Sequence, residues 1–418
     1  MKSMDSNKPA ILGGAPAVTE SHADNCKWPV LEDDDFEQVK SVLLDGDIST
    51  HPIRYELEAA YAQKFKRKYA ISHNNGTSAL FASFFACELE PGDEVLVTSA
   101  TWWASVLPML WLGAVPVFCE CETEQFGISL TDMKNKLTRK TKAIVVVHLW
   151  GMPSKMHEIE SFAKENNLKI IEDASHAHGA SINDKPCGSF GNVSVFSLQG
   201  DKLSPAGEGG VLLTDDYDIY EKALCFGDVT RIYQLDTPAQ RFAATSFGVK
   251  TRMAPLSAAV GLSQLNKLDK NNKLRNDNIE YVSTSLEELG FKTYLGTEQY
   301  KRTYFEFLIR WTPDCGIDQE ILVKALNAEG AEITSPRYPM VHQQPFFTEG
   351  LWNKIARLDN GLKQYDYNKV ALPITEQESQ LMIRLPHFST ASQKFLDQYI
   401  SAFKKVISHS DEISRSLS

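Results

Sequence analysis

Short apolar runs alternate with helical patterns between residues 69 and 214, and this alternation constrains the fold more than any other feature of the chain. Seven runs have the composition of strands: Tyr69–Ser72, Glu94–Thr98, Val115–Phe118, Ala143–His148, Lys169–Glu172, Ser194–Leu198 and Val211–Thr214. Helical patterns between them cover Ser78–Glu88, Trp103–Leu112, Leu130–Lys136 and Lys155–Asn166. Such strands, apolar along most of their length and separated by helices, predict an α/β fold with a mostly parallel sheet covered on both faces. Periodicity leaves the order and direction of the strands open.

The length of 418 residues predicts two domains, because a single hydrophobic core stops growing at about 250–300 residues. A long helical pattern, Ser257–Leu289, leads out of the alternating region. Beyond it the pattern is mixed, with strands expected at Arg302–Arg310 and Glu332–Ile333, helices at Asp318–Glu329 and Ala391–Ser408, and a frayed serine-rich tail after His409. We expect an N-terminal arm (residues 1–30), a large domain (31–275) and a smaller α+β domain (276–418).

Composition excludes several functional classes. The net charge of −11 argues against a nucleic-acid partner, although a local basic pocket could still bind a phosphorylated or nucleotide-linked small molecule. Seven widely spaced cysteines without a C-x-x-C pair predict reduced thiols, no metal site and a cytoplasmic protein. The polar N-terminus lacks the apolar segment of a signal peptide, and the longest apolar stretch, Val106–Cys119, is too short and too interrupted to span a membrane.

The segment Ser197–Gly210 holds one lysine, Lys202, in a turn between an expected strand and a glycine-rich run that leads into the next strand. A lysine on a tight loop between two buried strands is costly unless its amine is used. The obvious use is a Schiff base with a carbonyl cofactor. The segment therefore favours a pyridoxal phosphate (PLP) enzyme.

Two further segments could hold that cofactor. Asn74–Ser78 follows a strand and opens a helix, so its backbone N–H groups, Gly76 and the hydroxyls of Thr77 and Ser78 could form a phosphate cup, or simply an N-cap. Asp173 ends the strand before Ala174–Gly179, where it could pair with the pyridine nitrogen or cap the next helix. His176, three residues later, could hydrogen-bond the cofactor's phenolic oxygen.

Two more residues fit the same site. Trp102 follows the strand Glu94–Thr98 and could stack on the pyridine ring, or belong to the core. Ser197, five residues before Lys202, could reach the phosphate, or be an ordinary strand serine. Each signal is weak alone. All of them lie at strand ends or in the loops that follow, in an order that suits one site.

In the combination and order of these motifs, the chain resembles the DegT/StrS-type sugar and cyclitol aminotransferases. The resemblance extends from Leu12-Gly13-Gly14-Ala15-Pro16 to Leu385-Pro386-His387-Phe388. Its most specific pieces are Asn75–Leu80, Pro91–Val95, Glu172–Gly179, Ser197–Gly210 and Tyr338-Pro339. It implies the type I PLP-transferase (aspartate aminotransferase) fold, with a large domain built on the central sheet and a smaller C-terminal α+β domain.

The resemblance also assigns roles to residues of the site. Lys202 would form the Schiff base, Asp173 would contact the pyridine nitrogen, Trp102 would stack on the ring, and His176 would lie near the phenolic oxygen. Thr77, Ser78 and Ser197 would hold the phosphate. Members are homodimers or larger, with the phosphate site completed by a partner-subunit residue, typically an asparagine two positions before an Arg-Met pair. That position here is Lys250, a departure from the pattern.

The implied reaction is ping-pong transfer of an amine from an amino acid, by family habit L-glutamate, to a keto or aldehyde group. The acceptor would be a sugar or cyclitol: a nucleotide-linked keto-sugar, an oxo-octulosonate or scyllo-inosose. Residues expected to reach it are Trp103, Arg337, Tyr338 and His342. Two alternatives stay open, a PLP-dependent sugar dehydratase and a non-catalytic regulatory protein of the same fold. Relatives that dehydrate sugars have histidine at the position of Lys202, so the lysine favours transamination.

Overall fold

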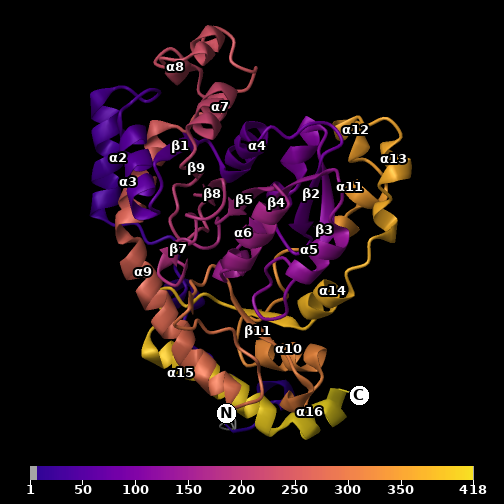
Figure 1. Cartoon of the computed structure of the whole chain (residues 1–418). Coiled ribbons are helices and arrows are strands. Elements are labelled where there is room, and N and C mark those ends of the chain that lie inside the picture. The colour runs from indigo at the N-terminus through magenta and orange to yellow at the C-terminus, as the bar shows by residue number, and fades with distance from the viewer. Residues whose placement is uncertain (1–6, 418) are drawn as a thin grey trace.

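The computed structural model describes residues 7–417, so residues 1–6 of the expected arm and Ser418 lie outside the described part. A seven-stranded sheet occupies its centre (Figure 1), in the order β1–β9–β8–β5–β4–β2–β3. The bounds are β1 Tyr69–His73, β2 Glu94–Thr98, β3 Val115–Cys119, β4 Thr141–Val147, β5 Lys169–Asp173, β8 Val193–Ser197 and β9 Gly210–Thr214. β9 runs antiparallel to both of its neighbours, β1 and β8, and the other adjacent pairs are parallel. The predicted mostly parallel sheet is confirmed.

The strands are apolar along their length because both faces of the sheet are covered. On β4, Ile144 and Val146 join a core shared with α5 (Leu130–Lys136) and α6 (Met156–Glu165). Val145 and Val147 point to the opposite face, where α4 (Gly76–Ala86) packs. Alternate residues of one strand thus enter different cores, as the pleat requires.

A long helix, α9 (Pro255–Glu287), connects the sheet to the C-terminal third of the chain. Its first half packs against α2 (Asp33–Asp45) and α3 (Ile53–Lys64), which lie along the same flank of the molecule (Figure 1). Its second half enters a separate core with α10 (Gln319–Ala328), α15 (Gln393–Ser408) and the two-stranded sheet β11 (Phe307–Arg310) and β12 (Met382–Leu385). The expected boundary at residue 275 falls inside α9, and the domain division stays a prediction.

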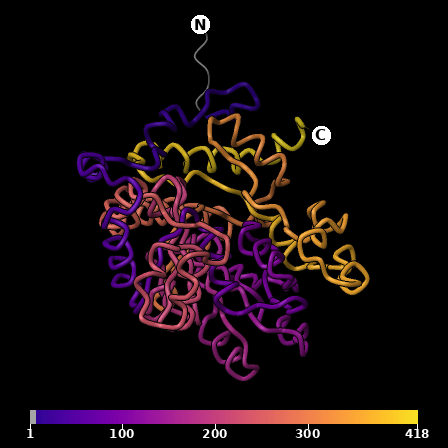
Figure 2. The backbone as a smooth tube through the Cα atoms, turned by 90° about the horizontal axis from the view of Figure 1, so that it is seen from above, coloured from indigo at the N-terminus to yellow at the C-terminus, as the bar shows by residue number. Residues whose placement is uncertain are grey.

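The start of the described chain, as far as Val18, lies beside the C-terminal helices rather than beside the sheet. Figure 2 shows the early residues next to the C-terminal helices, and η1 (Ala10–Leu12) contacts both α10 and α16 (Ser410–Leu417). The Val18 N–H donates to the Glu329 carbonyl oxygen at 2.9 Å. The first described residues therefore help to close the second core.

Three local expectations were wrong. Trp103–Leu112 forms two 3₁₀ helices, η2 (Trp103–Ser105) and η3 (Leu107–Leu112), because Pro108 lacks the N–H that a continuous helix would need. The expected strand Glu332–Ile333 shrinks to an isolated bridge between Thr334 and Arg384. The serine-rich tail forms α16, because Ile413 is fully buried in the second core.

The remaining elements are short, apart from α7. They are α1 His22–Asn25, η4 Leu149–Gly151, β6 Ser181–Ile182, β7 Lys185–Pro186, α7 Tyr217–Gly227, α8 Val229–Ile232, η5 Pro238–Phe242, β10 Tyr300–Lys301, η6 Pro313–Cys315, η7 Val341–Gln343, α11 Pro345–Thr348, α12 Asn353–Ala356, α13 Gly361–Gln364, η8 Tyr367–Lys369 and α14 Pro373–Gln380. All seven cysteines are unpaired. Within residues 7–417, every helix is too short or too polar to cross a bilayer.

Candidate active site

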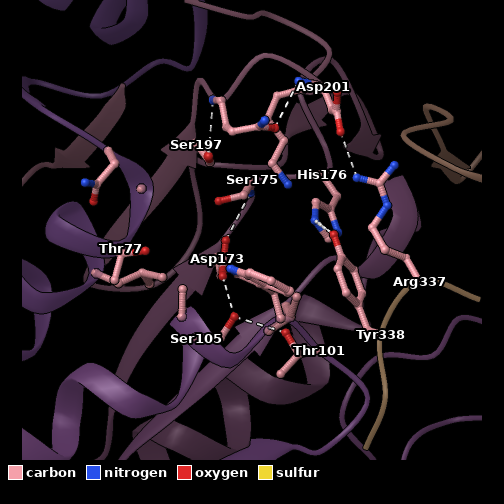
Figure 3. Close-up of a pocket in the computed structure, with 18 of the residues that line it drawn as sticks. Thr77, Thr101, Ser105, Asp173, Ser175, His176, Ser197, Asp201, Arg337 and Tyr338 are labelled. Carbon is pink, nitrogen blue, oxygen red and sulfur yellow. Dashed lines mark hydrogen bonds and ion pairs between the residues drawn. The ribbon is translucent and has the colours of Figure 1, made fainter. Parts of the chain in front are cut away.

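A cavity of about 400 Å³ opens where β2, β4, β5 and β8 end, beside the first turn of α4 (Figure 3). Ligands of open α/β sheets bind at the carboxyl ends of parallel strands. The expected site residues that line the cavity are Gly76, Thr77, Trp102, Asp173, His176, Ser197, Lys202, Arg337 and Tyr338. Residues more than 260 positions apart in the sequence therefore meet around one space.

Lys202 lies in the loop between β8 and β9. A turn closed by the Lys202 N–H on the Gln199 carbonyl oxygen shapes this loop, and Gly207 supplies a residue at φ +79°. The indole N–H of Trp28 donates to the Lys202 carbonyl oxygen at 3.0 Å, so the N-terminal segment also fixes the loop.

The Lys202 amine is buried beside an aromatic ring. Its Nζ lies 4.1 Å from the centre of the Phe305 ring, and the side chain is 8% exposed. Burial, offset in part by the charge of Asp173, lowers the pKa of Lys202 to about 8. A lysine with a lowered pKa has a larger fraction of neutral, nucleophilic amine near neutral pH.

The first turn of α4 forms one wall of the cavity. The Asn75 side chain accepts the Ser78 N–H at 2.8 Å. The backbone N–H groups of Gly76 and Thr77 have no partner within the helix, because they lie in its first turn. A Cβ added at Gly76 would lie 2.8 Å from the Ser197 Cβ, so only glycine allows α4 to approach the end of β8 this closely. The free N–H groups and the two hydroxyls of Thr77 and Ser197 suit an anion.

Asp173 ends β5 on the opposite wall. Its Oδ2 accepts the Ser105 hydroxyl at 2.7 Å, and its Oδ1 accepts the Ser175 N–H at 3.1 Å. Thr101 Oγ1 lies 3.0 Å from the Ser105 oxygen and can donate to it. These bonds hold a buried carboxylate in one orientation (Figure 3).

His176 lies between the sheet and the C-terminal part of the chain. Its Nδ1 accepts the Trp150 N–H at 3.3 Å, so the ring proton is assigned to Nε2, which lies 3.1 Å from the Tyr338 hydroxyl oxygen. The ring stacks on Phe305 at 4.1 Å. Burial and the positive charges of Lys202 and Arg337 hold the pKa of His176 well below its usual range. The imidazole is therefore a neutral hydrogen-bond donor.

Arg337 and Trp102 border the cavity where it opens to solvent. Arg337 Nη1 forms an ion pair with Oδ2 of Asp201 at 2.9 Å (Figure 3). Asp201 directly precedes Lys202 in the sequence. Trp102 is 45% exposed, and its ring centre lies 5.6 Å from that of Tyr338. A half-exposed tryptophan at the mouth of a pocket is available to stack on a flat ligand.

Four expected site residues do not line the cavity. The Ser78 N–H is used to cap α4, and Trp103 is half-exposed next to Trp102. His342 is buried, with Nδ1 2.7 Å from the Ser99 hydroxyl and Nε2 3.3 Å from Glu376. Lys250 is exposed on the segment next to Thr251, whose carbonyl oxygen accepts the Asn74 N–H. Their predicted roles stay predictions.

The residues present fit PLP. The anionic phosphate matches the free N–H groups of α4 with Thr77 and Ser197, and the glycine contact at Gly76 keeps this cup narrow. A protonated ring nitrogen matches the fixed carboxylate of Asp173. The carbonyl matches the Lys202 amine, whose pKa burial has lowered. Three chemically different ends of one cofactor thus meet three suitable groups.

Ser105 and Ser175, which hold Asp173, were missed by the sequence reasoning. Ser105 lies three residues after Trp102, which the sequence did single out, but its partner Asp173 lies 68 residues away. Ser175 lies two residues after Asp173, the spacing of a common side-chain-to-backbone turn.

Known proteins resemble the chain over nearly its full length. The family comparison matches residues 29–404 to the DegT/DnrJ/EryC1/StrS aminotransferase family. An L-glutamine:scyllo-inosose aminotransferase of Streptomyces griseus is 29% identical and covers 99% of this chain and 100% of its own. A GDP-perosamine synthase of Vibrio cholerae is 31% identical, over 80% of this chain and 84% of its own.

Solved structures agree with the sequence comparisons. An aminotransferase from Psychrobacter cryohalolentis superposes with a TM-score of 0.81 at 25% identity, covering 92% of this chain and 99% of that one. The expected type I fold is confirmed. The chain therefore belongs to the DegT/DnrJ/EryC1/StrS aminotransferase family and is a PLP-dependent aminotransferase.

Proposed function

We propose that this enzyme moves the amino group of L-glutamate or L-glutamine to a keto group of a sugar or cyclitol. The observation that carries the proposal is the meeting of Lys202, Asp173 and the first turn of α4 around one cavity, in a chain of this family. The relatives support the acceptor class, because one is a scyllo-inosose aminotransferase and another a GDP-perosamine synthase. The Streptomyces relative is named for L-glutamine as donor, whereas L-glutamate is the donor expected from the sequence.

In the proposed mechanism, PLP supplies an electron sink when bound. Lys202 accepts the proton that leaves the donor's α-carbon, because its lowered pKa makes the amine a base near neutral pH. Asp173, fixed by Ser105 and Ser175, keeps a proton on the cofactor's ring nitrogen. Thr77, Ser197 and the N–H groups of α4 bind the phosphate, and Trp102 excludes water from one face.

We further propose a homodimer in which Lys250 of one subunit reaches the phosphate site of the other. Lys250 is exposed, and a lysine can bind phosphate as a point charge. Trp102 and Trp103, both half-exposed, would be covered by the partner subunit. Donor and acceptor would use one cavity in turn, which gives ping-pong kinetics.

The variant Lys202→Ala tests the central role. We expect it to lose the visible absorption of the lysine-bound cofactor and all amine transfer from either donor. Lys64→Ala is the matched control, because this lysine is paired with Asp269 on the surface of α3. A Lys202→Ala protein that keeps wild-type absorption or wild-type transfer would overturn the assignment.

A further inference from the structure

A second cavity, of about 490 Å³, is lined by Glu306, Arg337, Arg384 and His387 among other residues. Arg337 lines both cavities. Phe305, whose ring contacts the Lys202 amine, also lines the second cavity. A molecule held at Lys202 could therefore extend past Arg337 into this space.

Glu306 is the unusual group of the second cavity. Its side chain is 3% exposed, and its Oε1 is bound by Arg337 Nε at 2.7 Å and by Arg384 Nη1 at 3.4 Å. Its Oε2 is buried and has no hydrogen-bond partner among residues 7–417. A buried carboxylate oxygen without a partner lowers the stability of the fold, and a ligand that donates a hydrogen bond to it would remove that cost in free energy.

Arg384 offers the complementary group. Its Nε donates to the Thr334 hydroxyl at 2.9 Å and its Nη1 faces Glu306, which leaves Nη2 free within the described part of the chain. The side chain is 30% exposed, so this N–H group can reach a ligand in the cavity. The free acceptor and the free donor thus belong to two side chains that contact each other through Oε1 and Nη1 at 3.4 Å.

The charges of this cavity are balanced. The guanidinium groups of Arg337 and Arg384 are matched by the two carboxylates that line the cavity, Glu306 and Glu332, and Arg337 is also paired with Asp201 outside it. Burial and the neighbouring arginines lower the pKa of His387 to about 3, so its ring is neutral. Arg275 stacks on Trp28 and does not line the cavity. Among the described residues, an added carboxylate would find no unpaired positive charge here, whereas a neutral group that both donates and accepts hydrogen bonds would find Glu306 Oε2 and Arg384 Nη2.

We propose that Glu306 and Arg384 bind the side-chain carboxamide of L-glutamine and that the negative charge of Glu306 selects it over L-glutamate as amino donor. The amide NH₂ donates to Glu306 Oε2, and the amide oxygen accepts from Arg384. The γ-carboxylate of glutamate has no hydrogen to donate and meets the charge of Glu306. This inference rests on the proposed function and adds the residue that discriminates between its two donors, Glu306.

The test compares donors within each variant, using the conversion of bound PLP to its amine form, which needs no acceptor. The wild type should favour glutamine over glutamate in kcat/KM by about tenfold or more. Glu306→Gln removes the repelling charge and frees one arginine, so this ratio should fall about tenfold or more. Arg384→Gln leaves an excess negative charge, so the ratio should rise.

Glu378→Gln is the matched control. Glu378 is another buried carboxylate bound by an arginine, Arg310, but it lines neither cavity. Its variant should keep the wild-type donor ratio. Opposite shifts in Glu306→Gln and Arg384→Gln cannot come from general loss of stability, because each ratio is measured on one protein.

A binding measurement gives a second readout. Glutaramate and glutarate carry the two side-chain groups without an α-amine, and calorimetry on the holoenzyme compares their dissociation constants. The wild type should prefer glutaramate, and Glu306→Gln should lose that preference. An unchanged preference, or donor ratios within about twofold of wild type in both cavity variants, would overturn the inference. Wild-type protein that reacts with neither amino acid would overturn the proposed donors, while the two analogues would still test Glu306.

Discussion

The hydroxyl of Ser105 should matter for catalysis although it lies behind Asp173. It donates to Asp173 Oδ2 at 2.7 Å in a buried site, and hydrogen bonds to charged groups contribute about 1.5–3 kcal/mol. Ser105→Ala frees that oxygen, so the carboxylate can turn away from the ring nitrogen it is proposed to hold. Because about 1.4 kcal/mol corresponds to tenfold in rate, kcat should fall by about 10- to 150-fold.

Steady-state kinetics of the donor half-reaction measures this effect. A positioning role predicts a loss in kcat with the donor KM nearly unchanged, together with a shifted absorption spectrum of the bound cofactor. Ser83→Ala is the matched control, because Ser83 is equally buried and its hydroxyl donates only to the Ala79 carbonyl oxygen of its own helix. A Ser105→Ala enzyme with kcat within about twofold of wild type would refute the reasoning.

Three further predictions follow from the cup, the lysine and the buried network behind β5. Gly76→Ala places a Cβ 2.8 Å from the Ser197 Cβ and should weaken PLP binding about tenfold in equilibrium dialysis. Gly200→Ala, whose added Cβ would have its nearest contact at 3.9 Å, should bind PLP as the wild type does, and equal affinities of the two variants would contradict the phosphate cup. With a pKa of about 8, the Lys202 amine is mostly protonated below this pH and mostly neutral above it. The rate at which the apoprotein binds PLP should therefore rise with pH and level off above pH 8. A rate that continues to rise up to pH 10 would count against the lowered pKa. Glu172→Gln replaces a fully buried carboxylate that is bound by His148, Gly188 and Phe190. Chemical denaturation should show a free energy of unfolding lower by about 3 kcal/mol, and a loss under about 1 kcal/mol would disprove a structural role.

The central sheet could be predicted because its strands carry a strong local signal. β2 is apolar on both faces and begins and ends where the sequence pattern indicates. The cavity could be predicted in outline for the same reason, because Asp173 and Ser197 end neighbouring parallel strands. Residues at the carboxyl ends of such strands lie close together in the fold, however long the sequence between them.

The parts that could not be predicted depend on strand order and on contacts across the chain. Ser105 meets Asp173 because β2 and β5 flank β4 in the sheet, and periodicity does not give that order. Glu306 meets Arg384 because β11 pairs with β12. The tail after His409 is polar in composition, yet one buried side chain, Ile413, fixes it as a helix.

The most direct test of the account follows the amino nitrogen itself. The enzyme would be incubated with L-glutamine labelled at its α-amino nitrogen and with a keto-cyclitol or nucleotide-linked keto-sugar, and the products analysed by mass spectrometry. We predict that the label appears in the acceptor as a new amine and that Lys202→Ala abolishes this transfer. Label that stays in the amino acid, or transfer that persists without Lys202, would contradict the account.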